Sequence, residues 1–477
     1  MKQILIGREQ EVQLLRDYLD TEKSEFIVVY GRRRVGKTFL IRQVIGNQSC
    51  FSMTGMENAG MKDQLFNFYF TLRRVWPSAT LPRSWIEAFD ELRNYLESLP
   101  KGKKIVFIDE LPWLDTVRSK FIAALEWFWN GWADGQENIK LIVCGSATSW
   151  MIDNIINNRG GLHNRKTHQV YVAPFTLEES RRYFATYGFG YREKEIAECY
   201  MVMGGVAYYY SLMTPKESVA QNIDRLFFAT NGELRNEFEN LYRSLFKKAG
   251  DHITIVKALA KKMEGLTRNQ LLQITNLNNN KKFTMTMEEL EKCGFIRSYI
   301  PFGMTKRDVL FQLTDAFTLF HFHYIIENKF QDETFWTNSL YSAKYRAWSG
   351  YAFEILCLNH LSQIKQSLGI SGMQSRACCW ISKPEEGHRG AQIDLIIDRA
   401  DQTVNICEMK FSRSEYTITK SDSEDIENKI EAFLRQTKTK KSLMVTFITS
   451  FGIKPGKYSG QVQRHLTLEN LFKSLSL

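Results

Sequence analysis

Apolar runs of strand length alternate with helical segments over the first third of the chain. Residues 26–30, 103–108, 141–145 and 169–172 are short and mainly apolar, which predicts strands buried on both faces. Residues 39–45 follow the first of these strands closely and have the pattern of a helix. Strands that alternate with helices predict an α/β domain built on a parallel sheet.

The middle of the chain changes to helical patterning. Apolar positions recur with a spacing near 3.6 over residues 180–250, which predicts a helical segment. Beyond it, three helical stretches lead into two strands joined by a glycine-containing turn, an order of elements that predicts a winged helix. Lys281, Lys282, Lys306 and Arg307 would place positive charge near its recognition helix and wing. Winged helices read DNA in some proteins and act as packing modules in others, and both interpretations remain open. The helices are expected at 253–263, 267–274 and 285–293, and the strands at 295–300 and 309–313.

Charged residues interrupt two strands in the last third of the chain. Residues 392–398 and 403–411 are apolar on both faces, which predicts central strands of a covered sheet, yet they contain Asp394, Glu408 and Lys410. A hairpin with its turn between the two ranges would set Asp394 opposite Glu408, and Lys410 shares the face of Glu408. Burying charges is costly unless they pair or bind a metal, so we expect a site here. The alternative is a solvent-facing pair of Glu408 and Lys410 on an edge strand.

Two carboxylates and a lysine at one end of a sheet suit the Mg²⁺-assisted hydrolysis of a phosphodiester. Asp394 and Glu408 would hold the metal ion. Lys410 would position the attacking water or stabilise the charge that develops on the phosphate. This region therefore predicts a second catalytic site, separate from any site in the first third of the chain.

Composition narrows the class of protein. The chain has 477 residues, 44% of them hydrophobic and 24% charged, which predicts a globular protein of about three domains. Its net charge of +10 suits a polyanionic partner such as DNA, although a charge spread so thinly also suits mere solubility. The eight cysteines form no CxxC pair, which argues against zinc and disulfides and predicts a reducing, cytoplasmic compartment. No segment reads as a membrane span or a signal peptide.

A phosphate-binding loop follows the first strand directly. The pattern G-x-x-x-x-G-K-T stands between a strand and a helix, which is the context that a nucleotide-binding loop requires. Its backbone N–H groups would wrap the phosphates of ATP, Lys37 would reach the β- and γ-phosphates, and the Thr38 hydroxyl would bind Mg²⁺. The loop consists of Gly31, Arg32, Arg33, Arg34, Val35, Gly36, Lys37 and Thr38.

Two acids end the strand at 103–108 and complete the predicted nucleotide site. Asp109 is placed to hold Mg²⁺, and Glu110 is placed to orient or deprotonate the attacking water. The strand at 141–145 ends in small polar residues that include Thr148 and Ser149. A side chain there could sense the γ-phosphate, or the segment could be a plain turn at the end of a strand.

With these motifs, residues 5–215 resemble the archaeal-type P-loop ATPases, close to the STAND group of signalling ATPases and related to the AAA proteins. The resemblance rests on Gly7-Arg8-Glu9, the phosphate loop, and the pair Asp109 and Glu110. It implies an ATPase core followed by a helical lid. By the same resemblance Arg165 could contact phosphate, either in its own chain or across the subunit boundary of a homo-oligomer. A solvated surface arginine is the alternative.

The D…E-x-K pattern of Asp394, Glu408 and Lys410 resembles the PD-(D/E)XK nuclease superfamily, which has the restriction-endonuclease fold. The likeness extends over residues 345–475, although Ile393 stands where the motif's proline would be. It implies that Glu354, on the first helix of that fold, joins the metal site. Such domains also occur as inactive DNA-binding scaffolds.

Together these observations predict a multidomain α/β protein. We expect an ATP-binding switch whose nucleotide state, with Mg²⁺, controls DNA cleavage or binding by the last domain. A regulatory or scaffolding DNA-binding protein with an inactive nuclease fold is the alternative, from a different functional class. The predicted domains are a P-loop ATPase core at 1–175, a helical lid at 176–250, a winged helix at 251–330 and a nuclease-like domain at 340–477.

Overall fold

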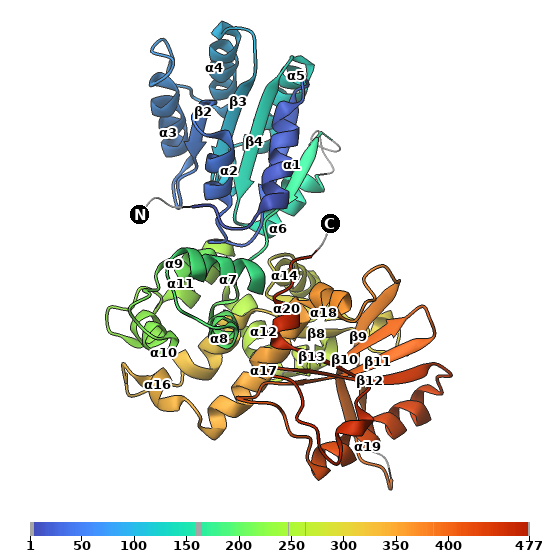
Figure 1. Ribbon diagram of the computed structural model, residues 1–477. Coiled ribbons are helices and arrows are strands. Elements are labelled where there is room, and N and C mark those ends of the chain that lie inside the picture. The colour runs from blue at the N-terminus through green and yellow to red at the C-terminus, as the bar shows by residue number, and fades with distance from the viewer. Residues whose placement is uncertain (1–3, 159–164, 247, 263, 385, 476–477) are drawn as a thin grey trace. The chain divides into compact units, whose positions relative to one another are not determined.

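The computed structural model divides the chain into two compact units (Figure 1). It describes residues 4–158, 165–246, 248–262, 264–384 and 386–475. The first unit comprises residues 1–174 with 243–247, and the second comprises 175–242 with 248–477. The predicted end of the ATPase core at residue 175 lies at this division. The lid, winged-helix and nuclease-like ranges fall mostly in the second unit, and their boundaries stay predictions. Among the described residues, no helix is both long and apolar enough to cross a membrane.

A parallel sheet of five strands forms the centre of the first unit. Its strand order is β2-β3-β4-β1-β5, and every neighbouring pair is parallel. The predicted parallel α/β fold is therefore confirmed, and the four strands expected from apolar runs are all present. The fifth, β2, was not predicted. The strands are β1 (Glu25–Tyr30), β2 (Ser49–Thr54), β3 (Lys104–Asp109), β4 (Ile139–Gly145) and β5 (His168–Tyr171).

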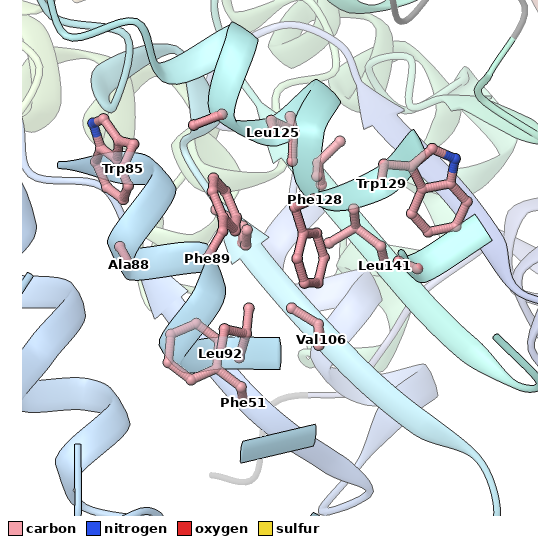
Figure 2. Packing of buried hydrophobic residues seen from close by; sticks show 14 of the residues in the cluster. Phe51, Trp85, Ala88, Phe89, Leu92, Val106, Leu125, Phe128, Trp129 and Leu141 are labelled. Atoms are coloured by element: carbon pink, nitrogen blue, oxygen red, sulfur yellow. The ribbon is translucent and has the colours of Figure 1, made fainter. Parts of the chain in front are cut away.

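Helices pack on both faces of this sheet, which explains why its strands are apolar throughout. Phe26 and Val28 point into one cluster of buried residues, whereas Ile27 and Val29 point into another. In the first cluster, Phe89 and Phe128 from the covering helices pack over Val106 of β3 (Figure 2). The first cluster includes residues of α3 (Met61–Arg73), α4 (Trp85–Ser98) and α5 (Phe121–Gly131), and the second includes residues of α1 (Glu9–Asp20) and α2 (Lys37–Ile45).

The second unit begins with short helices, as the spacing over 180–250 predicts. A further group of elements then appears in the order helix, strand, helix, helix, strand, strand. Its three strands form an antiparallel sheet in the order β6-β8-β7. The Thr267 side chain caps the second helix of the group by accepting a hydrogen bond from the N–H of Gln270. The order of helices and strands is the one expected, with the short strand β6 in addition; the winged helix itself and DNA reading by it stay predictions. The first helices are α7 (Leu177–Thr186), α8 (Glu193–Met203), α9 (Ala207–Ser211), α10 (Val219–Ile223) and α11 (Glu237–Leu245), and the group is α12 (Gly250–Lys261), β6 (Leu266–Thr267), α13 (Arg268–Thr275), α14 (Lys281–Lys292), β7 (Ile296–Tyr299) and β8 (Leu310–Leu313).

A mixed sheet of five strands ends the second unit, in the order β13-β12-β11-β10-β9. Strands β9, β10 and β11 are antiparallel, and β11, β12 and β13 are parallel. Strands β10 and β11 are central, as predicted from their apolar character. Leu395 pairs with Cys407 in this hairpin, so the next positions along the strands are Asp394 and Glu408, the register expected from the sequence. The strands are β9 (Ser375–Ser382), β10 (Ala391–Arg399), β11 (Thr403–Lys410), β12 (Ser442–Thr449) and β13 (Arg464–Thr467), with helices α17 (Ala343–Asn359), α18 (Leu361–Ser367), α19 (Lys420–Thr437) and α20 (Leu468–Leu471).

Candidate nucleotide site and carboxylate cluster

The phosphate loop connects the carboxyl end of β1 to the first residue of α2, Lys37. Gly31 has φ = 147° and Gly36 has φ = 93°, conformations that L-amino acids with a side chain rarely adopt. At Gly31 the constraint is also spatial, because a Cβ atom would lie 2.2 Å from the carbonyl oxygen of Val172. The glycine therefore lets β1 turn into the loop while the segment after β5 packs against it.

Backbone carbonyl groups of the loop hold the Lys37 side chain. Its Nζ donates hydrogen bonds to the carbonyl oxygens of Gly31, at 2.9 Å, and Arg32, at 2.8 Å. Burial lowers the pKa of this ammonium group, whereas the nearby Asp109 and Glu110 carboxylates act in the opposite direction. A buried cation fixed inside a phosphate loop is placed to contact the phosphates of a bound nucleotide.

Thr38 and Asp109 bring two oxygen ligands together. The Thr38 Oγ1 donates a hydrogen bond of 2.8 Å to the Asp109 Oδ2, and Asp109 is only 3% exposed. The other carboxylate oxygen accepts the N–H of Glu110 at 3.0 Å. A hydroxyl and a carboxylate next to a phosphate loop are the ligands that Mg²⁺ takes in such sites, so these residues fit the predicted ion.

Glu110 is fixed by the residue that follows β4. The Ser146 Oγ lies 2.7 Å from both carboxylate oxygens of Glu110, and its N–H donates to one of them at 3.2 Å. Glu110 itself has φ = 47°, a left-handed conformation that turns the chain sharply after β3. The sequence suggested Thr148 and Ser149 as residues that could sense the γ-phosphate. Ser146, in the same polar run, is the residue that contacts the predicted catalytic acid.

The four residues between the two glycines of the phosphate loop differ in burial and in their contacts. Arg33 makes an ion pair of 3.6 Å with Glu57, and its guanidinium lies 6.0 Å from the ring centre of Trp113. Arg32 is 6% exposed, whereas Val35 is buried in the core on the α1–α2 side of the sheet. Arg34 has φ = 71°, which places it in the tight turn before α2. Arg33 is therefore held at the edge of the predicted nucleotide site.

Arg165 lies at the opposite end of the sheet from the phosphate loop. It precedes β5, and Thr167 donates its N–H to Phe26 at the amino end of β1, whereas the loop follows the carboxyl end. The Arg165 side chain is exposed and makes an ion pair of 3.3 Å with Asp134. The structure does not bring it to the nucleotide site of its own chain. A contact with nucleotide on a neighbouring copy stays a prediction.

The residues predicted for the second site come together at the central hairpin of the mixed sheet. Asp394 lies on β10, Glu408 and Lys410 lie on β11, and Glu354 lies on α17; we call these four residues the carboxylate cluster. The Lys410 Nζ is 3.7 Å from the Glu408 Oε2. Buried Glu408, only 6% exposed, thus has a cation beside it, and an edge strand facing solvent is ruled out.

Lys429 on α19 completes this charge network, and sequence reasoning missed it. Its Nζ lies 2.6 Å from the Glu408 Oε1 and 3.1 Å from the Asp425 Oδ2. The two carboxylates raise the pKa of Lys429 against the effect of burial, so it stays charged. The only signal in the sequence was the spacing of Asp425 and Lys429, which is common on exposed helices.

Glu354 has a raised pKa, so its carboxyl group retains its proton more readily than a glutamate in water does. Burial raises its pKa to about 8, and the charge of Asp394 acts in the same direction while Lys410 opposes it. Asp394 in turn accepts a hydrogen bond of 2.6 Å from the Gln392 side chain. Two neighbouring carboxyl groups in a buried place need either a proton or a cation between them.

The cluster has suitable donor atoms for a divalent ion but not a finished metal site. Carboxylate oxygens are the ligands that Mg²⁺ prefers. However, within the described part of the chain no three such side chains lie close enough together to hold a metal ion. Glu408, one of the expected metal ligands, is already engaged in an ion pair with Lys429. The described residues therefore form a cluster of carboxyl groups and lysines, and metal binding by it stays a prediction.

Comparison with known proteins identifies the first part of the chain. Residues 5–212 match the family described as "ATPase domain predominantly from Archaea". This part of the chain is an archaeal-type ATPase domain. The family resemblance stated for residues 5–215 is thereby confirmed. Assignment to the STAND group and to the nuclease superfamily stays a prediction.

Two proteins of one archaeon are similar to this chain in sequence. An uncharacterized protein of Methanocaldococcus jannaschii is 25% identical over 398 residues, which cover 82% of this chain and 84% of that protein. An uncharacterized ATP-binding protein of the same organism is 38% identical over 45 residues, 9% of this chain and 76% of that protein. The first of these matches extends far beyond the ATPase domain.

Solved structures similar to this chain include two archaeal proteins. A Walker-type ATPase of Pyrococcus abyssi has 18% sequence identity and a TM-score of 0.46, and the match covers 66% of this chain and 95% of that one. The ORC2 protein of Aeropyrum pernix has 16% identity and a TM-score of 0.30, with 69% of this chain and 95% of that one covered.

Proposed function

We propose that the chain is an ATP-binding and ATP-hydrolysing switch that controls the binding and Mg²⁺-dependent cleavage of DNA by its C-terminal domain. The observation that carries this proposal is the carboxylate cluster. A central β-hairpin and α17 bring three acids and Lys410 to one place in a chain that also has an archaeal-type ATPase domain.

In the ATPase domain, different residues are suited to phosphate binding, to Mg²⁺ binding and to the activation of water. Lys37 would bind the β- and γ-phosphates, and Thr38 with Asp109 would hold Mg²⁺, which when bound neutralises phosphate charge. Glu110, held by Ser146, would accept a proton from the attacking water. The hydrogen bonds from Ser146 orient the carboxylate before any substrate arrives, which favours catalysis.

In the carboxylate cluster, the residues divide into acids and a cation. Asp394 and Glu408 would be the ligands of a divalent ion, which when bound polarises the scissile phosphate. Lys410 would donate a hydrogen bond to that phosphate, since it lies beside Glu408 on the same strand. Glu354 would be the third acid beside this ion; burial raises its pKa to about 8 without a metal, and a bound divalent ion would favour its carboxylate form.

DNA is the proposed partner on grounds of charge. The chain has 63 lysine and arginine residues against 53 acidic ones, an excess that favours a polyanion. The exposed side chains of Lys281, Lys282, Lys306 and Arg307 lie on α14 and on the turn between β7 and β8. These are the elements by which a winged helix would contact a duplex.

One observation favours a second function, a nucleotide-dependent DNA-binding protein without nuclease activity. Lys429 is paired with Glu408 at 2.6 Å, so one expected metal ligand is already neutralised by a protein cation. In an inactive nuclease fold, such a pair would stabilise the domain after its catalytic role was lost. The two functions make opposite predictions for Asp394.

The test is cleavage of end-labelled single- and double-stranded DNA with Mg²⁺ or Mn²⁺. We expect Asp394→Asn to reduce cutting by about a hundredfold or more, because it removes the charge of a metal ligand while preserving the side-chain volume. Asp398→Asn is the matched control, since Asp398 lies on the same strand and pairs with Lys441. Two results would support the inactive nuclease fold: equal cutting by Asp394→Asn and wild type, or no cutting by the wild-type chain.

A further inference from the structure

A small cavity lies next to the carboxylate cluster, inside the second unit. Its volume is about 150 Å³, and it is lined by the β7–β8 hairpin, by the mixed sheet, and by Leu358 of α17 and Leu361 of α18. The hairpin contributes Arg297, Tyr299 and Gln312, and the sheet contributes Cys379 and Asp394. Asp394, a predicted ligand of the nuclease-like site, is therefore also a wall of this cavity.

The hairpin is attached firmly to the sheet. The N–H of Phe302 donates a hydrogen bond of 2.8 Å to the carbonyl oxygen of Cys379 on β9. The ring of Phe302 lies 5.0 Å from that of Phe433 on α19, within the core of the C-terminal domain. Because backbone and side chain both hold it, the hairpin has a defined place beside the carboxylate cluster rather than a chance contact with it.

Arg297 is the cation that the hairpin brings to the cavity. Its Nε and Nη2 both donate to the side-chain oxygen of Gln312, at 3.0 and 2.7 Å, across the β7–β8 ladder. This fixes the plane of the guanidinium and leaves its remaining N–H groups for another acceptor. Among the described residues, no acidic side chain lies within 4.0 Å of it to form an ion pair.

The buried guanidinium of Arg297 would be stabilised by a bound anion. Burial lowers the pKa of Arg297 to about 10, so it is charged at neutral pH despite lacking an ion-pair partner. Removing a charge from water costs free energy that a bound anion can restore. A phosphate group suits this role, because the planar N–H donors of a guanidinium match its oxygens. The cavity volume of about 150 Å³ equals that of roughly five water molecules at about 30 Å³ each, which leaves room for a phosphate group.

We propose that Arg297 binds a backbone phosphate of a DNA strand, next to Asp394, so that the substrate site combines the winged-helix-like hairpin with the nuclease-like sheet. This inference rests on the proposed function, which it makes more specific. The phosphate held by Arg297 would position the strand for the carboxylate cluster. Gln312 is a positioning residue, since it acts by orienting the guanidinium.

The test measures the affinity of the full-length chain for a fluorescein-labelled DNA duplex and for the corresponding single strand, without divalent ions so that no cutting occurs. We expect Arg297→Gln to weaken binding of the better ligand at least about tenfold. We also expect the slope of log affinity against log salt to fall by about 0.7–0.9, the loss of one phosphate contact. Arg297→Lys should restore most of the slope, because it restores the charge.

Arg346→Gln is the matched control, because Arg346 is an exposed arginine on α17 and its loss changes the net charge equally. It should leave the slope unaltered. Wild-type affinity and slope in a folded Arg297→Gln protein would overturn the inference, as would a wild-type chain that binds neither DNA. If the only role of Arg297 were to balance the charges of Glu354 and Asp394, the slope of log affinity against log salt would be the same in Arg297→Gln and in wild type. Binding that depends on Arg297 in a chain that never cuts would support the inference and reject the nuclease.

Discussion

Replacing Glu110 by glutamine should reduce ATP hydrolysis by about a thousandfold while leaving ATP binding nearly intact. The amide has the size of the carboxylate and can still bond to Ser146, but it cannot accept a proton from water. General bases contribute about 10²–10⁴ to the rate of such reactions, so the loss should lie in that range. The measurement is steady-state phosphate release beside equilibrium binding of a fluorescent ATP analogue.

Glu22→Gln is a suitable control for this experiment. Glu22 is an exposed acid between α1 and β1, at the amino end of the sheet and away from the phosphate loop. Its loss changes the net charge by the same amount and should alter neither hydrolysis nor binding. Equal hydrolysis by Glu110→Gln and wild type would contradict the role assigned to Glu110 and leave Ser146 with only a structural function.

Replacing Lys37 by methionine should weaken ATP binding on the order of a thousandfold. Methionine preserves much of the buried side-chain volume but removes the ammonium group that loop carbonyls hold in place. Hydrogen bonds to charged groups contribute roughly 1.5–3 kcal/mol each, and contacts with two phosphates would give an effect of this size. Isothermal titration with ATP and Mg²⁺ measures it directly.

Lys140 offers an unusually close control for Lys37. It too is a buried lysine that donates to backbone carbonyl oxygens, in this case of Thr21 and Lys23, but at the amino end of the same sheet. Lys140→Met should lower the melting temperature without changing the ATP affinity of the folded protein. If both variants lost affinity equally, the effect would reflect destabilisation of the sheet and not phosphate binding.

The parts of the structure that the sequence predicts well are those encoded locally. The apolar runs gave the four main strands because strands buried on both faces have no polar alternation. The phosphate loop was recognisable because its glycines must adopt positive φ at fixed spacing. The register of Asp394 with Glu408 followed from a short hairpin, in which the position of the turn determines the pairing.

The parts that the sequence did not predict depend on contacts between distant segments. Lys429 reaches Glu408 from a helix whose own pattern is that of an ordinary surface helix. Ser146 is one of several small polar residues after β4, and only the three-dimensional arrangement shows which contacts Glu110. Arg297 looks like a plain strand residue until the hairpin is seen against the mixed sheet. For Arg165, the resemblance suggested a phosphate contact that the fold does not provide within one chain.

The most direct test of the account is whether nucleotide controls cleavage. End-labelled DNA is incubated with Mg²⁺ and the wild-type chain, with and without ATP, beside Lys37→Met and Glu110→Gln. We predict that ATP changes the cutting rate of wild type at least about tenfold, that Lys37→Met shows no response to ATP, and that Glu110→Gln keeps the ATP-bound rate. Cutting by wild type at the same rate with and without ATP would contradict the account, as would the absence of cutting on every DNA.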